Sequence, residues 1–196
     1  LTEVVARLAV GTPADVDRAV EAAHQAYLSW RTVAPAERAG KLLEAAEVLS
    51  GSAEELAPLL VREHGGVLWE AQTDFALGTG VLQHTASLTE QFFVPVEYDD
   101  ETSFIRIEKM ARGVVAAIVP WNMPIVLTMM KLAPALATGN TLVLKPSPFA
   151  SAALTLALQR MAEKFPAGVI NVVHGDSDVG QALTSHPLVR KIGFTG

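Results

Sequence analysis

The stretch from residue 113 to residue 148 places the strongest constraint on how this chain of 196 residues can fold. It contains two short apolar runs, residues 114–119 and 141–144, which lack the alternation of half-exposed strands and are typical of buried parallel strands. An apolar segment of helical length lies between them, and Gly139 is expected to end that helix. We therefore predict a βαβ unit whose strands both lead into polar, Pro-containing loops, at the edge where open α/β sheets bind ligands.

The alternation of strands and helices continues to the end of the chain. Helical patterns at residues 151–164 and 179–185 alternate with apolar runs at residues 169–173 and 188–194. Strands that alternate with helices favour a parallel, doubly wound sheet. The predicted fold class is therefore α/β, with a Rossmann-like parallel sheet.

The region before this unit shows helical periodicity and is predicted to form an N-terminal helical layer over one side of the sheet. Trp30 is expected to anchor the first helix in the core. Gly51 is expected to separate the second helix from the third, and the fourth is expected to be loose around Gly78 and Gly80. The predicted helices comprise residues 12–30, 35–51, 52–61 and 68–91.

Residues 92–112 change in character, because apolar positions alternate with polar ones on both sides of an acidic turn at residues 99–101. This pattern predicts a β-hairpin. A two-stranded hairpin is marginally stable by itself and needs a partner surface. That surface belongs either to another subunit or to the domain from which the hairpin extends.

The charge distribution narrows the classes of partner. The net charge is −6 and no basic cluster is present, which argues against nucleic acid and anionic membranes as partners. The longest apolar stretch, residues 123–138, contains Lys131 and Pro134 and is too short to span a membrane. Residues 1–3 show no secretory signal, and we expect a cytoplasmic location.

Individual charged residues in the helical region have a simple explanation. Arg38, Glu63 and Glu70 are expected on solvated helix faces or in surface ion pairs. The chain has no cysteine and its five histidines are scattered, so that we expect no disulfide and no metal site. Its high apolar fraction of 50% fits either an Ala- and Val-rich core or surfaces that meet another subunit or the rest of a longer chain.

Asn122 and Lys145 are candidate site residues because each follows a predicted strand. Asn122 lies between Pro120 and Pro124, so its amide is held where it can stabilise an oxyanion or, alternatively, cap the next helix. Lys145 can reach a ribose hydroxyl or a phosphate, or can snorkel at the strand terminus. A later loop, bounded by Gly175 and Gly180, enters a helix and is either a site of close anion approach or a plain turn.

Several motifs, taken in order, resemble the signature of the NAD(P)-dependent aldehyde dehydrogenase superfamily. They are Pro120-Trp121-Asn122-Met123-Pro124, Gly139-Asn140-Thr141, Lys145-Pro146-Ser147, Gly175-Asp176 with Gly180, and Phe194-Thr195-Gly196. The resemblance covers nearly the whole chain. It implies the oxidation of a small-molecule aldehyde to a carboxylic acid with NAD or NADP, through a thiohemiacetal on a cysteine.

The resemblance also implies roles for individual residues. Asn122 helps to form the oxyanion hole, and Lys131 either belongs to a proton path or is a structural lysine. Many relatives have Glu at the position of Pro148, and its absence removes a negative charge beside the ribose, which leaves both cofactors as candidates. The implied cofactor-binding residues are Ile118, Val119, Pro120, Trp121, Lys145, Ser147, Pro148, Gly175, Gly180, Phe194, Thr195 and Gly196.

The same resemblance implies a domain organisation. Residues 1–91 and 113–196 correspond to an incomplete NAD(P)-binding domain, and residues 92–112 to an arm for subunit assembly, so that a homo-oligomer, a dimer or tetramer, is expected. The catalytic Cys and Glu are expected outside this chain, and this segment alone is predicted to be inactive. The alternatives are a non-catalytic nucleotide-binding or interaction module derived from the family, and a related reductase that uses an acyl phosphate.

Overall fold

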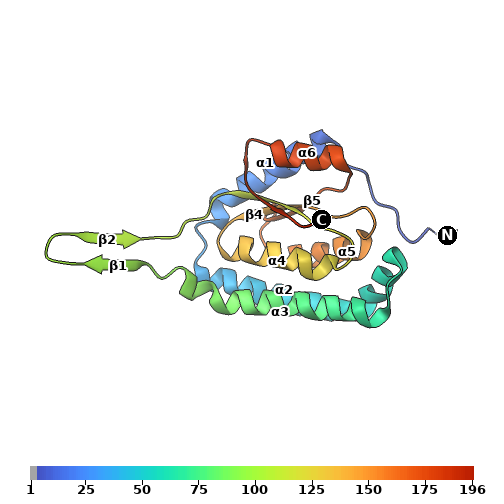
Figure 1. Ribbon diagram of the computed structural model, residues 1–196, viewed down its shortest axis with the longest axis horizontal. Helices are drawn as coiled ribbons and strands as arrows, with labels where there is room; N and C mark the ends of the chain where they lie inside the picture. The colour runs from blue at the N-terminus through green and yellow to red at the C-terminus, as the bar shows by residue number, and fades with distance from the viewer. Residues whose placement is uncertain (1–3) are drawn as a thin grey trace.

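A four-stranded parallel sheet with strand order β5-β4-β3-β6 forms the centre of the computed structural model, which describes residues 4–196 (Figure 1). Helices α1 and α6 cover one face of this sheet, and α4 and α5 cover the other. The predicted α/β fold with a parallel sheet is therefore confirmed. The sheet consists of β3 (Val114–Ile118), β4 (Thr141–Lys145), β5 (Ile170–Val172) and β6 (Val189–Phe194). The helices are α1 (Pro13–Trp30), α2 (Pro35–His64), α3 (Leu68–Phe92), α4 (Pro124–Ala137), α5 (Ala152–Ala162) and α6 (Ser177–Ser185).

The two central strands are buried along almost their whole length and mostly apolar, because both faces of the sheet are covered. Val115 and Ala117 of β3 belong to the larger core, which the sheet shares with α2, α3, α4 and α5. Val114 and Ala116 point the other way, into a smaller core with α1 and α6. Helices α2 and α3 form an outer layer against α4 and α5 (Figure 1). The predicted N-terminal helical layer is therefore correct for α2 and α3 but wrong for α1, which packs on the opposite face of the sheet beside α6.

The expected break at Gly51 in the helical layer does not occur. Helix α2 runs without interruption through Gly51, and the Ser52 hydroxyl, which was expected to start a new helix, donates instead to the Val48 carbonyl at 2.8 Å. Helix α3 is likewise continuous. A Cβ atom at Gly78 would lie 3.0 Å from Cγ2 of Ile125, so this glycine permits close packing of α3 on α4. Burial of a continuous apolar face outweighs the low helix propensity of glycine here.

The expectation for Arg38 and Glu63 is also wrong. Arg38 is only 3% exposed, and its Nε donates to the Ala137 carbonyl at 2.8 Å, which ties α2 to the end of α4. Glu63 accepts hydrogen bonds from the first backbone N–H groups of α5, those of Ser151, Ala152 and Ala153, at 2.9, 2.6 and 2.9 Å. Both side chains therefore satisfy helix ends, where backbone groups lack partners within the helix.

The core prediction for Trp30 is confirmed. Its side chain is 1% exposed, and the indole Nε1 donates to the Leu136 carbonyl at 3.2 Å. Gly139 follows the end of α4 with φ of +79°, a left-handed conformation that glycine adopts without the strain that other residues meet. The predicted end of the crossover helix is thereby confirmed.

The predicted hairpin is present as β1 (Val96–Asp99) and β2 (Phe104–Ile107), which pair antiparallel. It extends away from the sheet and helices rather than folding back on them, and all eight strand residues are exposed (Figure 1). Asp100 closes the turn, since its carboxylate accepts hydrogen bonds from the backbone of Thr102 and Ser103 at 2.8 and 2.9 Å. Among residues 4–196, none of the helices combines the length and the apolar character that crossing a membrane requires.

Candidate active site

Three neighbouring parallel strands end together at one edge of the sheet. Ile118, the last residue of β3, is paired in register with Lys145 of β4 on one side and with Phe194 of β6 on the other. Beyond the strand ends, the Thr195 backbone nitrogen donates to the Ile118 carbonyl at 3.1 Å. The loops that carry Asn122, Lys145 and Thr195 therefore emerge at the same edge, as the βαβ prediction requires.

Asn122 lies in the turn between β3 and α4, where its side chain is exposed. Within residues 4–196 its amide makes no hydrogen bond, and Met123, not Asn122, occupies the position that precedes α4. The alternative that Asn122 caps this helix is therefore wrong. The amide is free to donate to a ligand.

Asp74 of α3 caps α4 instead. Its carboxylate accepts hydrogen bonds from the backbone nitrogens of Ile125 and Val126 at 3.0 and 2.7 Å, and the side chain is 2% exposed. Burial raises the pKa of Asp74 above its ordinary value, although both backbone hydrogen bonds act in the opposite direction. Sequence reasoning missed this residue. The available signal was an acidic residue next to Phe75, on the buried stripe of α3.

Lys131 lies on α4 and contacts the end of β6. Its Nζ donates to Oγ1 of Thr195 at 2.6 Å and to the Leu127 carbonyl at 3.3 Å. Its alkyl chain passes Gly193, where a Cβ atom would lie 3.4 Å from Cδ of Lys131. Partial burial lowers the pKa of Lys131. The structure thus joins two of the predicted site residues, Lys131 and Thr195, in one hydrogen bond.

Lys145 is buried at the end of β4, beside the start of α6. Its Nζ makes a long hydrogen bond of 3.3 Å to the Pro146 carbonyl, and burial lowers its pKa, with Asp176 and Asp178 acting in the opposite direction. A Cβ atom at Gly180 would lie 3.4 Å from Cε of Lys145. The Lys145 ammonium group therefore lies close to the N-terminus of α6. The ammonium group and the helix N-terminus both favour an anionic or hydroxyl-bearing ligand.

The remaining predicted cofactor-binding residues differ in how far they are exposed to solvent. Ser147 is buried and Pro148 is exposed. A Cβ atom at Gly175 would lie 2.4 Å from Cγ2 of Val179, so only glycine fits there. Ile118, Pro120, Thr195 and Gly180 are half-buried, whereas Trp121, Phe194 and Gly196 are exposed. Val119 is 2% exposed and packs in the larger core, which leaves its side chain little surface for a ligand.

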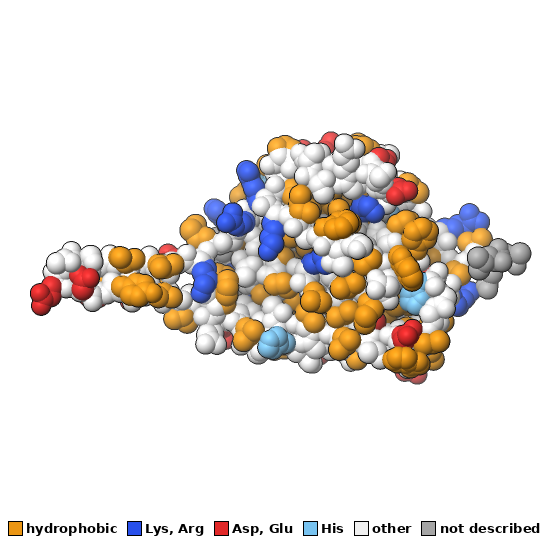
Figure 2. Space-filling model, in the orientation of Figure 1, with side chains coloured by type: hydrophobic (Ala, Val, Ile, Leu, Met, Phe, Trp, Pro, Cys, Tyr) orange, Lys and Arg blue, Asp and Glu red, His pale blue; other side chains and the backbone are white. Residues whose placement is uncertain are grey.

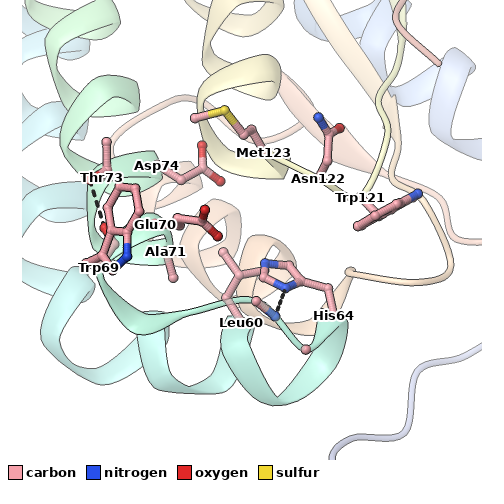
Figure 3. Close-up of a pocket in the computed structure, with 12 residues that line it drawn as sticks. Leu60, His64, Trp69, Glu70, Ala71, Thr73, Asp74, Trp121, Asn122 and Met123 are labelled. Carbon is pink, nitrogen blue, oxygen red and sulfur yellow. Dashed lines mark hydrogen bonds between the residues drawn. The ribbon is translucent and has the colours of Figure 1, made fainter.

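A cavity of about 540 Å³ lies beside Asn122 (Figure 3). Trp121, Asn122 and Met123 form one side of it, and residues from the end of α2 and the start of α3 form the other. In Figure 3 the Glu70 carboxylate and the His64 ring point into the space between Trp69 and Trp121. Lys131 and Lys145 do not line this cavity, so the structure separates the predicted site into an Asn122 region and a Lys145 region.

Nowhere in the part of the chain that the structure describes do three His, Asp or Glu side chains gather closely enough to hold a metal ion.

The sequence and the fold of this chain are similar to those of known proteins. The sequence matches the profile of the aldehyde dehydrogenase family over residues 1–196. A betaine aldehyde dehydrogenase from Vibrio vulnificus is 37% identical over 200 residues, which represent 99% of this chain and 40% of that protein. A salicylaldehyde dehydrogenase from Pseudomonas putida, solved with salicylaldehyde, superimposes with a TM-score of 0.92 at 30% identity, over 98% of this chain and 41% of its own.

A third relative was solved with a cofactor. Betaine aldehyde dehydrogenase from Staphylococcus aureus, in complex with NAD+, superimposes with a TM-score of 0.91 at 32% identity. The superposition covers 97% of this chain and 40% of that one. The chain therefore spans about 40% of the length of the relatives that it matches.

Proposed function

Because the chain belongs to the aldehyde dehydrogenase family, we propose that it is the N-terminal part of an enzyme that oxidises an aldehyde to a carboxylic acid with NAD or NADP. The observation that supports this most is the register of the three central strands. Their ends at Ile118, Lys145 and Phe194 bring the Asn122 loop, the Lys145 loop and Thr195 to one edge of the sheet. One edge thus carries a free amide donor and a buried ammonium group.

Asn122 acts on the substrate oxygen in this proposal. A cysteine thiolate adds to the aldehyde carbon, and the carbonyl oxygen takes up the negative charge of the thiohemiacetal. The Asn122 amide donates a hydrogen bond to that oxygen, and removing one such donor typically lowers the rate by about 10²–10³. The chain has no cysteine, so the nucleophile and the Glu general base belong to sequence outside these 196 residues.

The Lys145 region suits the adenosine end of a dinucleotide. Lys145 has a single long hydrogen bond within the described chain, and glycines lie beside it at the start of α6. Lys145 and Ser147 bind the ribose, and the loop of Gly175 and Gly180 approaches the adenine and the pyrophosphate. Bound NAD or NADP supplies the hydride acceptor. Pro148 places no carboxylate at the ribose, so the donor set accommodates either cofactor.

The hairpin is the assembly arm in this proposal, and residues 1–91 and 113–196 form the cofactor-binding domain. One face of the hairpin ribbon is apolar, because Val96 pairs with Ile107 and Tyr98 with Ile105. Each of these four residues is exposed. Such a face needs a partner surface, which a second copy of the protein supplies in a cytoplasmic homo-oligomer.

A non-catalytic nucleotide-binding module is the second candidate, and the absence of cysteine from the chain favours it. The intact mass of the purified protein, combined with an assay of aldehyde-dependent NAD(P) reduction, separates the two candidates. A mass well above 20.8 kDa with turnover supports the dehydrogenase. A mass equal to that of this chain, with cofactor binding but no turnover, contradicts it and supports the module.

A further inference from the structure

We infer that the cavity beside Asn122 takes an aldehyde whose opposite end carries a positive charge, such as an alkylammonium group. This inference rests on the proposed function, because it assumes that the aldehyde end lies at Asn122. It concerns the other end of the cavity, which Trp69 and Glu70 line (Figure 3). The cavity volume of about 540 Å³ lies within the range of small-molecule sites.

Glu70 supplies a negative charge that the described chain does not neutralise. Its carboxylate takes part in no ion pair or side-chain hydrogen bond within residues 4–196. None of the described residues that line the cavity is Lys or Arg. A cationic ligand would therefore meet a carboxylate without competition from a Lys or Arg side chain in the cavity lining.

His64 and Asp74 line the same cavity, and each has a hydrogen-bond partner within the described chain. The backbone nitrogen of Gly66 donates to Nδ1 of His64 at 2.9 Å, so that Nδ1 acts as an acceptor. Asp74 also lines the cavity, with its two oxygens occupied by Ile125 and Val126. Glu70 is therefore the carboxylate in the cavity lining whose oxygens are not occupied by other described residues.

Two tryptophans strengthen the case for a cation. Trp69 and Trp121 are 65% and 49% exposed and lie on opposite sides of Glu70 and His64 (Figure 3). Aromatic faces attract ammonium groups, most strongly those of tryptophan. The positive end of the α3 dipole also stabilises a carboxylate in the first turn of this helix. This effect is sufficient to account for the presence of Glu70. It does not explain two exposed tryptophans around the same space.

The test uses two aldehydes of the same shape that differ only in charge, trimethylammonioacetaldehyde and 3,3-dimethylbutanal. We expect the full-length protein to prefer the cationic aldehyde about tenfold or more in kcat/KM, and Glu70→Gln to reduce that preference about tenfold. Glu54→Gln, which removes the same charge from an exposed position of α2 outside the cavity, should leave the preference unchanged. Equal activity on the two aldehydes, or an equal loss for both in Glu70→Gln, overturns the inference while the proposed oxidation stands.

Binding without turnover separates this inference from the proposed function. Choline and 3,3-dimethylbutan-1-ol form the matching unreactive pair, and quenching of tryptophan fluorescence reports their binding to the wild type and to Trp69→Phe. Tighter binding of choline that weakens in both Glu70→Gln and Trp69→Phe supports the cation site, even if no aldehyde is oxidised. Equal binding of choline and the neutral alcohol contradicts it, whatever the activity.

Discussion

The carboxylate of Asp74 lies 2.7 Å from the backbone nitrogen of Val126, across residues that are 52 positions apart in the sequence. This hydrogen bond, with a second one to Ile125, fixes the start of α4 directly after the loop that carries Asn122. A residue of the helical layer thus sets the position of the candidate catalytic amide. Asn122 itself is therefore not needed to hold the start of α4 in place.

The free energy of unfolding should depend on pH because Asp74 titrates at a different pH in the folded and the unfolded protein. Burial raises its folded-state pKa above the value of 3.8 that applies when it is exposed. Its contribution to the free energy of unfolding is therefore fully present below about pH 3.8 and is lost as the pH rises through the raised pKa. Urea unfolding of the wild type and Asp74→Asn should show the wild-type advantage shrinking as the pH rises. An advantage that grows with pH would contradict this prediction.

Glu63→Ala should destabilise the fold, because it leaves the first N–H groups of α5 without their acceptor. We expect a loss of about 1–2 kcal/mol in the free energy of unfolding, as for other helix caps. Chemical denaturation measures it. Glu54→Ala on the same helix is the control, since Glu54 is exposed and should change the stability little. Similar effects of the two variants would mean that the cap contributes nothing specific.

Asn122→Ala tests the oxyanion role. In the full-length enzyme, kcat for aldehyde oxidation should fall by about 10²–10³, because one donor to the oxyanion is removed. Neither the melting temperature nor the affinity for the cofactor should change, since the amide makes no hydrogen bond within the described chain. Steady-state kinetics, a thermal melt and a cofactor titration measure the three quantities. Unchanged kcat with a lowered melting temperature would assign Asn122 a structural role.

Lys145→Met tests the cofactor region. Loss of a buried ammonium donor should weaken NAD binding about tenfold or more, since hydrogen bonds to charged groups are worth about 1.5–3 kcal/mol. Isothermal titration with NAD and NADP measures the effect for each cofactor. Lys191→Met removes an exposed lysine of β6 and should leave both affinities unchanged. Equal losses in both variants would indicate a general effect of net charge instead of a ribose contact.

We predict that the apolar face of the hairpin contributes to the assembly of subunits. Replacing Tyr98 and Ile105 together by Ser should lower the oligomeric mass, because this cross-strand pair forms part of the apolar face. Size-exclusion chromatography with light scattering measures that mass. The control is Glu97→Gln with Arg106→Gln, a surface ion pair of 2.8 Å that is expected to contribute little. An unchanged mass in the Tyr98 and Ile105 variant would rule out this face as the contact.

The parallel sheet, the crossover helix, the hairpin and the edge that carries Asn122 and Lys145 could be predicted from the sequence. Each depends on patterns that are local to a segment, such as the apolar run of β3 and the glycine after α4. The break predicted at Gly51 was wrong, because glycine propensity is a weaker local signal than the burial of a continuous helix face. The cavity lined by Trp69 and Glu70 could not be predicted, since it forms between segments that are distant in sequence.

The sequence by itself therefore determined the order and kind of the elements, and the strand ends at which ligand-binding residues lie. Only the tertiary structure decided which side chains complete those elements. Arg38, Glu63 and Asp74 satisfy helix termini that lie 99, 88 to 90 and 51 to 52 positions away in the chain. The physical reason is that a helix leaves its terminal backbone groups unpaired, and any polar side chain that the packing brings close can satisfy them. Which one does so depends on how the layers pack.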